Sequence, residues 1–113
     1  MQTENNLQYQ CYLWAYNNFP QIRGLFFSVP NGGLRNQREA STLKATGLTP
    51  GIPDMILLKP LAGFEFKTLT GVISPSQQKI HDTWRKAGVE VYIIRDFGSF
   101  EKIIKRIIDE NGI

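Results

Sequence analysis

The segment from Gly51 to Gln77 constrains the fold of this chain more than any other. The continuous apolar run from Met55 to Leu58 is typical of a strand that is covered on both faces. From Phe64 to Leu69 polar and apolar residues alternate, which is typical of a strand with two different faces. Pro60 and Gly63 stand between the two runs and favour a turn. The segment therefore predicts an antiparallel β-hairpin.

The register of this hairpin decides which charged side chains meet. A four-residue turn over Lys59 to Ala62 puts Asp54 opposite Lys67, with Glu65 as its diagonal neighbour on the same face. Two carboxylates and one ammonium group then converge. Adjacent carboxylates repel each other, and a hard divalent ion such as Mg²⁺ relieves that repulsion. The alternative interpretation is a surface Glu–Lys pair on a strand, with an aspartate at a turn.

These residues resemble a known nuclease signature. Pro53-Asp54 followed by Glu65-Phe66-Lys67 looks like the PD-(D/E)XK pattern, which is weak by itself. An ordered set of further residues resembles the VRR-NUC (virus-type replication-repair nuclease) family from Glu4 to about Ile94. These residues are Pro30-Asn31-Gly32-Gly33-Leu34-Arg35, Ala40, Leu43-Lys44, Gly47, Gly51, Gly71, Ser74-Pro75 and Gln77.

The order of expected elements is helix, strand, helix, strand, strand, helix, strand, helix (α-β-α-β-β-α-β-α). We expect an α/β fold with a restriction-endonuclease-like PD-(D/E)XK core, in which helices flank a mixed central sheet. The length of 113 residues fits one nuclease domain spanning residues 1–113. The resemblance implies a DNA endonuclease that depends on Mg²⁺ or Mn²⁺. Small free-standing members of the family are thought to act on branched DNA.

The expected site consists of Asp54 and Glu65 as metal ligands, with the backbone carbonyl of Phe66 as a further ligand. Lys67 would position or activate the attacking water. Gln77 has two interpretations. With Ser74 at the N-cap it completes a capping box, whereas the family pattern assigns this glutamine to the active site.

A helix is expected over residues 3–17, with Thr3 as its N-cap. Glu4 in its first turn is favourably placed near the positive end of the helix dipole. Alternatively, Glu4 and Gln8 match the E-x-x-x-Q of the family's first helix, which would make Glu4 an additional metal ligand.

The segment after Pro30 offers a candidate DNA-binding surface. Asn31, Gly32 and Gly33 form an expected tight turn, and Arg35 and Arg38 follow one helical turn apart. Backbone amides and guanidinium groups arranged in this way suit phosphates, although a solvated helix face explains the arginines equally well. Lys44, near the end of the helix expected over Leu34 to Ala45, completes the DNA-binding set.

Two further expectations concern residues late in the chain. His81, one turn beyond Gln77, is expected to be a satisfied, partly buried residue and not a general base. Ser99 is the expected cap of a last helix with an isoleucine-rich stripe. Core packing explains most of that stripe, and a dimer interface could use the rest.

The composition limits the class of protein. A net charge of +3 tilts the chain only mildly toward polyanions, and a single cysteine excludes an intrachain disulfide and a cysteine zinc cluster. Without a signal peptide or a membrane-length apolar run, we expect a cytoplasmic protein. A homodimer would match the two-fold symmetry of a four-way (Holliday) junction. Its candidate patches are the last helix and the first helix around Trp14 and Tyr16.

Two other functions remain open from the sequence. One is a non-catalytic nucleic-acid-binding module that kept the fold. The other is a sequence-specific restriction-type nuclease, for which 113 residues leave little room.

Overall fold

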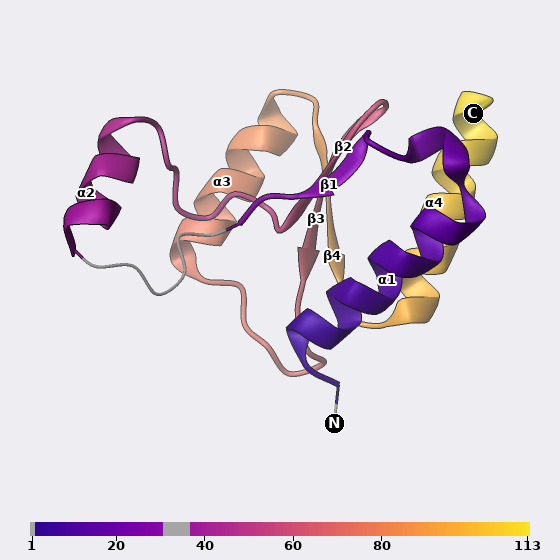
Figure 1. Ribbon diagram of the computed structural model, residues 1–113, viewed down its shortest axis with the longest axis horizontal. Helices are drawn as coiled ribbons and strands as arrows, with labels where there is room; N and C mark the ends of the chain where they lie inside the picture. The colour runs from indigo at the N-terminus through magenta and orange to yellow at the C-terminus, as the bar shows by residue number, and fades with distance from the viewer. Residues whose placement is uncertain (1, 31–36) are drawn as a thin grey trace.

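The computed structural model describes residues 2–30 and 37–113, arranged as a four-stranded sheet with helices on both faces (Figure 1). The elements are α1 (Glu4–Asn18), a 3₁₀ turn η1 (Pro20–Ile22), β1 (Phe26–Ser28), α2 (Gln37–Ala45), β2 (Met55–Leu58), β3 (Leu61–Phe66), α3 (Pro75–Lys86), β4 (Glu90–Ile94) and α4 (Phe97–Asn111). Apart from η1, this is the order expected from the sequence.

The sheet is mixed and has the strand order β1-β2-β3-β4. β1 pairs with β2, and β2 with β3, in antiparallel fashion, whereas β3 and β4 are parallel. Helix α3 makes the crossover that a parallel pair requires. The fold is therefore a mixed α/β sheet flanked by helices, consistent with a PD-(D/E)XK-like core.

The hydrophobic core lies between the sheet and the pair α1 and α4. Phe100 of α4 packs on Phe26, Phe64 and Phe66 of the strands, with ring centroids 5.8–6.2 Å apart. Each fully buried side chain of this kind contributes roughly 1.5–3 kcal/mol. The isoleucine-rich stripe of α4 faces this core, since Ile104, Ile107 and Ile108 are buried. Core packing thus explains the stripe.

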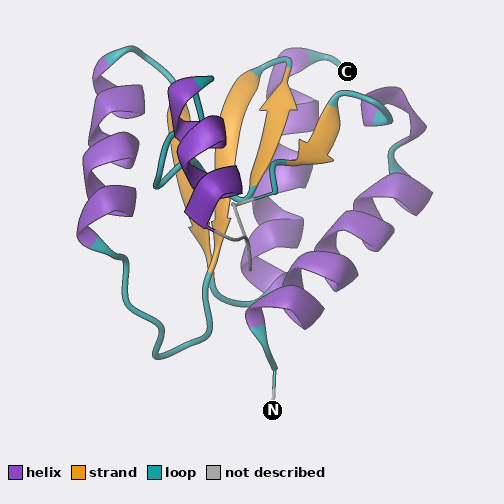
Figure 2. Cartoon of the chain, turned by 60° about the vertical axis from the view of Figure 1, so that its left-hand side comes forward, coloured by secondary structure: helices purple, strands orange, loops and turns teal. Residues whose placement is uncertain are grey.

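Helix α3 covers the opposite face of the sheet, while α2 stands apart from both layers (Figures 1 and 2). Gly63 of β3 permits the close approach of α3, because a Cβ atom there would lie 2.9 Å from the Trp84 ring and 2.8 Å from Pro53. No helix in the described ranges is both long enough and apolar enough to cross a bilayer.

The hairpin differs from the expected register. β3 begins at Leu61 and not at Phe64, and Leu58 pairs with Leu61 across a two-residue turn. Gly63 therefore lies within the strand. The pairing Met55–Phe64 extrapolates to Asp54 beside Glu65, and not opposite Lys67. The expected and the observed register differ by two residues. Because a shift by an even number of residues preserves the face of each side chain, Asp54, Glu65 and Lys67 still share one face of the hairpin.

The helix caps agree with the sequence except at α4. Thr3 caps α1 and Ser74 caps α3, as expected. At α4 the N-cap is Asp96 and not Ser99, because the Asp96 carboxylate accepts hydrogen bonds from the Ser99 backbone N–H (2.8 Å) and the Ser99 hydroxyl (3.0 Å). A carboxylate three residues earlier thus takes the capping position.

Candidate active site

The candidate site lies where β2 begins and β3 ends, beside the N-terminus of α3. Asp54 directly precedes β2, and one of its carboxylate oxygens (Oδ2) accepts a hydrogen bond of 2.7 Å from the Phe66 backbone N–H. The Asp54 carbonyl accepts another, of 2.8 Å, from the Val29 N–H. These two hydrogen bonds connect Asp54 to β3 and to the residue that follows β1, the two strands that flank β2 in the sheet.

Glu65 is the central residue of this site. Its side chain is only 1% exposed and contacts the Asp54 carboxyl group. Burial raises the pKa of Glu65 to about 9, and the neighbouring Asp54 adds to the shift, whereas the Lys67 charge opposes it. A carboxyl group in such a place stays protonated at neutral pH unless a cation joins the pair.

Lys67 follows β3 directly and is largely buried, with 8% of its surface exposed. Its backbone N–H donates to the Ile94 carbonyl (2.9 Å), which continues the β3–β4 pairing beyond the strand end. The lysine is close enough for its charge to lower the pKa of Glu65. The hairpin thus brings Asp54, Glu65 and Lys67 together, as the sequence predicted.

Gln77 closes the predicted capping box and also contacts Glu65. Its side-chain Oε1 accepts from the Ser74 backbone N–H (2.8 Å) and so closes the capping box, while its Nε2 donates to Glu65 Oε2 (3.4 Å). Because an amide has an acceptor at one end and donors at the other, one side chain serves both partners.

His81 is a satisfied residue, as expected, but it is fully buried and its partner is Glu65, which the sequence did not predict. It is 1% exposed, and its Nε2 lies 3.1 Å from Glu65 Oε1. Burial lowers the pKa of His81 below its ordinary 6.5, and Arg85 adds to this effect, so the ring is neutral at physiological pH. The spacing of four residues from Gln77 places both side chains on one face of α3, and this was the signal that could have revealed it.

The loop before Asp54 is fixed against α3. Gly51 has a φ of +91°, and a Cβ atom there would overlap the Ser76 carbonyl and approach the Gln77 nitrogen to 2.9 Å. Because only glycine fits this conformation and this space, the loop and the N-terminus of α3 lie in backbone contact. This contact fixes the position of Asp54 relative to Gln77.

Of the remaining predicted residues, the structure describes the side chains of Glu4 and Lys44. Glu4 is exposed in the first turn of α1, but its charge still raises the pKa of Glu65. Lys44 is exposed in the last turn of α2. Asn31, Gly32, Gly33 and Arg35 lie outside the described residues, as does the side chain of Arg38.

The residues present fit a hard divalent ion. Within residues 2–30 and 37–113 no three side chains of His, Cys, Asp or Glu come together as a metal-binding group, so the carboxylate pair is the available donor set. Two carboxylates plus water are typical of Mg²⁺ sites in proteins. The raised pKa of Glu65 also indicates that the pair needs a cation to ionise fully.

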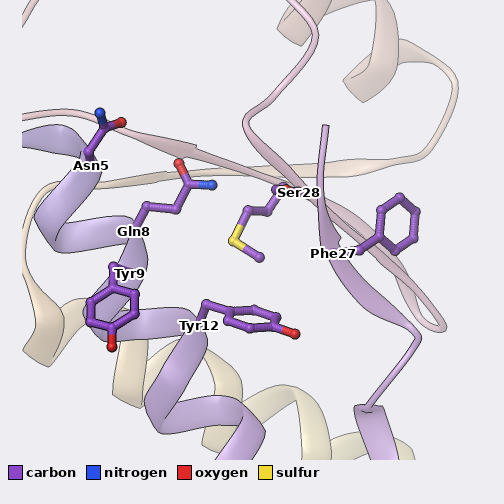
Figure 3. A pocket seen from close by; sticks show the side chains of 7 residues that line it. Asn5, Gln8, Tyr9, Tyr12, Phe27 and Ser28 are labelled. Atoms are coloured by element: carbon purple, nitrogen blue, oxygen red, sulfur yellow. The ribbon is translucent and has the colours of Figure 1, made fainter. Parts of the chain in front are cut away.

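A hollow of about 520 Å³ lies between α1 and the edge strand β1 (Figure 3). Gln8 and Tyr12 project from α1 toward β1. The hollow is lined by Asn5, Gln8, Tyr9, Tyr12, Phe27, Ser28 and Met55. Because successive side chains of a strand point to opposite faces, Met55 lies on the α1 side of the sheet, and none of Asp54, Glu65 and Lys67 lines the hollow.

Comparison with known proteins supports the class of fold that this geometry defines, a mixed α/β core of the PD-(D/E)XK type. Among solved structures, the fold is similar to one described as a VRR_NUC domain protein, with a TM-score of 0.78. The similarity covers 96% of this chain and 89% of that one at 17% sequence identity, a level that shows the fold alone. No family model matches the chain, and no curated protein matches its sequence.

Proposed function

We propose that this protein is a metal-dependent endonuclease that hydrolyses phosphodiester bonds in DNA. The observation that carries the proposal is the carboxylate pair of Asp54 and Glu65 at the end of the sheet, with Lys67 beside it. A non-catalytic DNA-binding module would gain nothing from two adjacent carboxylates facing phosphates, which repel them. The similarity to a VRR_NUC domain protein supports the same class.

In this proposal Asp54 and Glu65 would hold Mg²⁺ or Mn²⁺, together with the backbone carbonyl of Phe66. Glu4 is exposed and forms no three-residue group with them in the described structure, so it would become an additional ligand only if the first turn of α1 moved toward the ion. The bound ion would supply Lewis-acid stabilisation of the phosphate and of the leaving oxygen. Lys67 orients the attacking water and offsets the negative charge that builds up on the phosphate.

Gln77 and His81 position Glu65. Gln77 Nε2 donates to Glu65 Oε2 (3.4 Å), and His81 Nε2 forms a hydrogen bond of 3.1 Å with the other oxygen, Oε1. A carboxylate offers about four lone-pair sites, so two such bonds orient Glu65 and still leave it able to bind a metal ion. Because hydrogen-bond partners of metal ligands commonly matter for affinity, we assign both residues this positioning role.

The substrate that we favour is branched DNA such as a four-way (Holliday) junction, cut by a homodimer in the cytoplasm. One chain has one carboxylate pair in its described part, and a two-fold dimer would present two. The modest net charge of +3 favours recognition by shape over tight binding to any duplex. Asn31, Gly32, Gly33, Arg35, Arg38 and Lys44 are the proposed phosphate contacts. A restriction-type nuclease is the weaker candidate, since 113 residues leave little room for dedicated recognition elements.

The test is a panel of labelled linear, flap, single-stranded and four-way-junction DNAs with Mg²⁺, Mn²⁺ or EDTA. We expect the wild-type protein to cut branched DNA in either metal, and EDTA to stop the reaction. Asp54→Asn and Glu65→Gln should each abolish cutting because each removes an anionic oxygen from the metal, while DNA binding survives or tightens. Metal-dependent cutting by either purified variant would contradict the proposal that Asp54 and Glu65 hold the catalytic metal ion.

A further inference from the structure

The segment that follows Lys67 is fastened to the end of β4. Because β3 and β4 are parallel, their last residues lie at the same edge of the sheet, and Figure 2 shows the two following loops leaving there together. The Lys67 backbone N–H donates to the carbonyl of Ile94, the last residue of β4 (2.9 Å). The next residue, Arg95, holds the chain beyond Lys67.

The contacts of Arg95 fix a turn over residues 68–71. One of its guanidinium nitrogens (Nη1) donates to the carbonyls of Thr68 (2.7 Å) and Gly71 (2.8 Å), with the Leu69 carbonyl at 3.4 Å. The Gly71 N–H donates to the Thr68 carbonyl (3.2 Å) and closes the turn. Hydrogen bonds from a charged donor are stronger than those between neutral groups. Since residues 68–71 belong to no helix or strand, Arg95 supplies the partner that a regular element would otherwise provide.

The turn held by Arg95 lies against the side chain of Lys67. A Cβ atom built at Gly71 would lie 3.5 Å from the Cβ atom of Lys67 and 3.1 Å from the Thr68 hydroxyl, so Gly71 packs on the base of the lysine side chain. Within residues 2–30 and 37–113, no hydrogen bond or ion pair holds the Lys67 ammonium group. The direction of this group therefore depends on the backbone and on the atoms that pack against its stem.

We propose that Arg95 is a positioning residue for Lys67, because it holds the turn over residues 68–71 against the stem of the lysine and so directs the ammonium group. The inference rests on the proposed function, in which Lys67 orients the attacking water. Arg95 has no contact with substrate in this proposal and acts only through Lys67. Orientation of this kind matters for rate, since a displacement of about 1 Å at a reacting group can cost about 100-fold.

The alternative is that Arg95 only stabilises the fold. The loop that contains the turn continues to Ser74 and Gln77 at the start of α3. A purely structural role would therefore disturb the metal site, and the loss of Arg95 would lower metal affinity and cleavage together. A positioning role affects kcat, and its effect disappears when Lys67 is already absent, because two residues that act through one group are not additive.

The test is a double-mutant cycle of Arg95→Ala and Lys67→Ala, on the DNA that wild type cuts fastest. We expect Arg95→Ala to lower kcat about 10- to 100-fold, while KM and the calorimetric affinity for Mn²⁺ stay unchanged. Arg95→Ala should slow the Lys67→Ala protein no further. Added guanidinium chloride should restore part of the rate in Arg95→Ala and none in Lys67→Ala. An equal loss of rate in both backgrounds, or a loss of Mn²⁺ affinity, would overturn the inference.

A second variant tests the same contact and keeps the guanidinium group. Gly71→Val places a side chain against the stem of Lys67, so kcat should fall while the protein remains folded. Gly98→Val is its control, because a Cβ atom there would meet only the Asp96 carboxylate, at 3.4 Å. Arg106→Ala is the control for Arg95, since that guanidinium group forms no hydrogen bond with residues 67–71. Both controls should cut like wild type, and wild-type kcat in Gly71→Val would contradict the inference.

A measurement that needs no cleavage separates this inference from the proposed function. In NMR spectra of the metal-free protein, a nuclear Overhauser contact between the Gly71 α-protons and the Lys67 β-protons should be present in wild type and lost in Arg95→Ala. Its persistence in Arg95→Ala would overturn the positioning role. If wild type cuts no DNA at all, the proposed function fails instead, and the NMR contact still decides whether Arg95 places Lys67.

Discussion

At the scale of single residues, Glu65 is the carboxyl group whose pKa is raised, by burial and by the neighbouring Asp54. A buried carboxyl group beside a second carboxyl group, with only one nearby lysine to offset it, favours its protonated form. The same arrangement makes the residue a good ligand once a divalent ion is present. Metal binding must then displace the proton, which couples metal affinity to pH.

We predict that the stability of the metal-free protein falls as the pH rises. The pKa of Glu65 is raised from an ordinary 4.5 to about 9, so the folded state holds this proton more tightly than the unfolded chain does. The contribution is fully present below 4.5 and is lost as the pH rises through about 9. Thermal melts in EDTA across this range would show the melting temperature decreasing.

Glu65→Gln is the control, because it has no carboxyl group to titrate and should show a flatter pH profile. Added Mn²⁺ should stabilise wild type more at the alkaline end than at the acidic end, since deprotonated Glu65 is the ligand. Identical pH profiles for the two proteins would show that Glu65 is not the titrating group.

At the scale of secondary-structure elements, the N-terminal part of α3 both caps its own helix and contacts Glu65. Its capping box satisfies backbone groups at the helix end, and its first two turns supply Gln77 and His81 to Glu65. The backbone contact at Gly51 joins this helix end to the loop that leads into Asp54. The three elements β2, β3 and α3 thus form the frame of the site.

We predict that Gln77→Glu separates the capping role of this residue from its contact with Glu65. Glutamate at the third helical position is a good capping residue, so the melting temperature should hold. The side chain loses its donor to Glu65 and adds a negative charge to the site, so cleavage should fall about 10- to 100-fold and the metal affinity should differ from that of wild type. Calorimetric titration with Mn²⁺ and the cleavage assay would measure both.

Ser76→Glu is the matched control, because it adds the same charge one residue earlier at an exposed position. It should retain activity. Wild-type cleavage and metal affinity in Gln77→Glu would confine Gln77 to the cap.

At the scale of the whole molecule, the two candidate dimer patches, on α4 and on α1, differ in how much apolar and aromatic surface they leave exposed to solvent. The stripe of α4 is used by the core, and Trp14 of α1 packs on Phe19, Phe97 and Phe100. The outer face of α1 remains, where four large side chains are between 38% and 66% exposed: Tyr9, Tyr12, Leu13 and Tyr16. This face adjoins the edge strand β1 and the hollow in Figure 3.

We predict that the protein is a homodimer in solution and that the outer face of α1 forms its interface. Light scattering should give twice the chain mass of 12.9 kDa. Leu13→Lys places a charge in this face and should yield monomers, whereas Leu58→Lys, at an equally exposed leucine of the hairpin turn, should remain dimeric. A wild-type monomer would refute the dimer, and a dimeric Leu13→Lys would move the interface elsewhere.

The sequence by itself determined the order of the elements, the presence of a hairpin after Asp54, although not the bounds of its second strand, and the shared face of Asp54, Glu65 and Lys67. These features depend on local patterns, because the side chains of a strand alternate with a period of two and a shift by two residues preserves the face. The capping box of α3 was also readable, because a cap involves residues only three apart.

Only the tertiary structure decided the turn length, the direct contact of Asp54 with Glu65 and the burial of His81. Each involves groups that are distant in the chain: Gly63 of β3 lies against Pro53 and Trp84, and His81 reaches Glu65 across 16 residues. Such contacts follow from how α3 packs on the sheet. A local pattern carries no information about that packing, and so the same histidine that looked ordinary in sequence lies against the central carboxylate of the site.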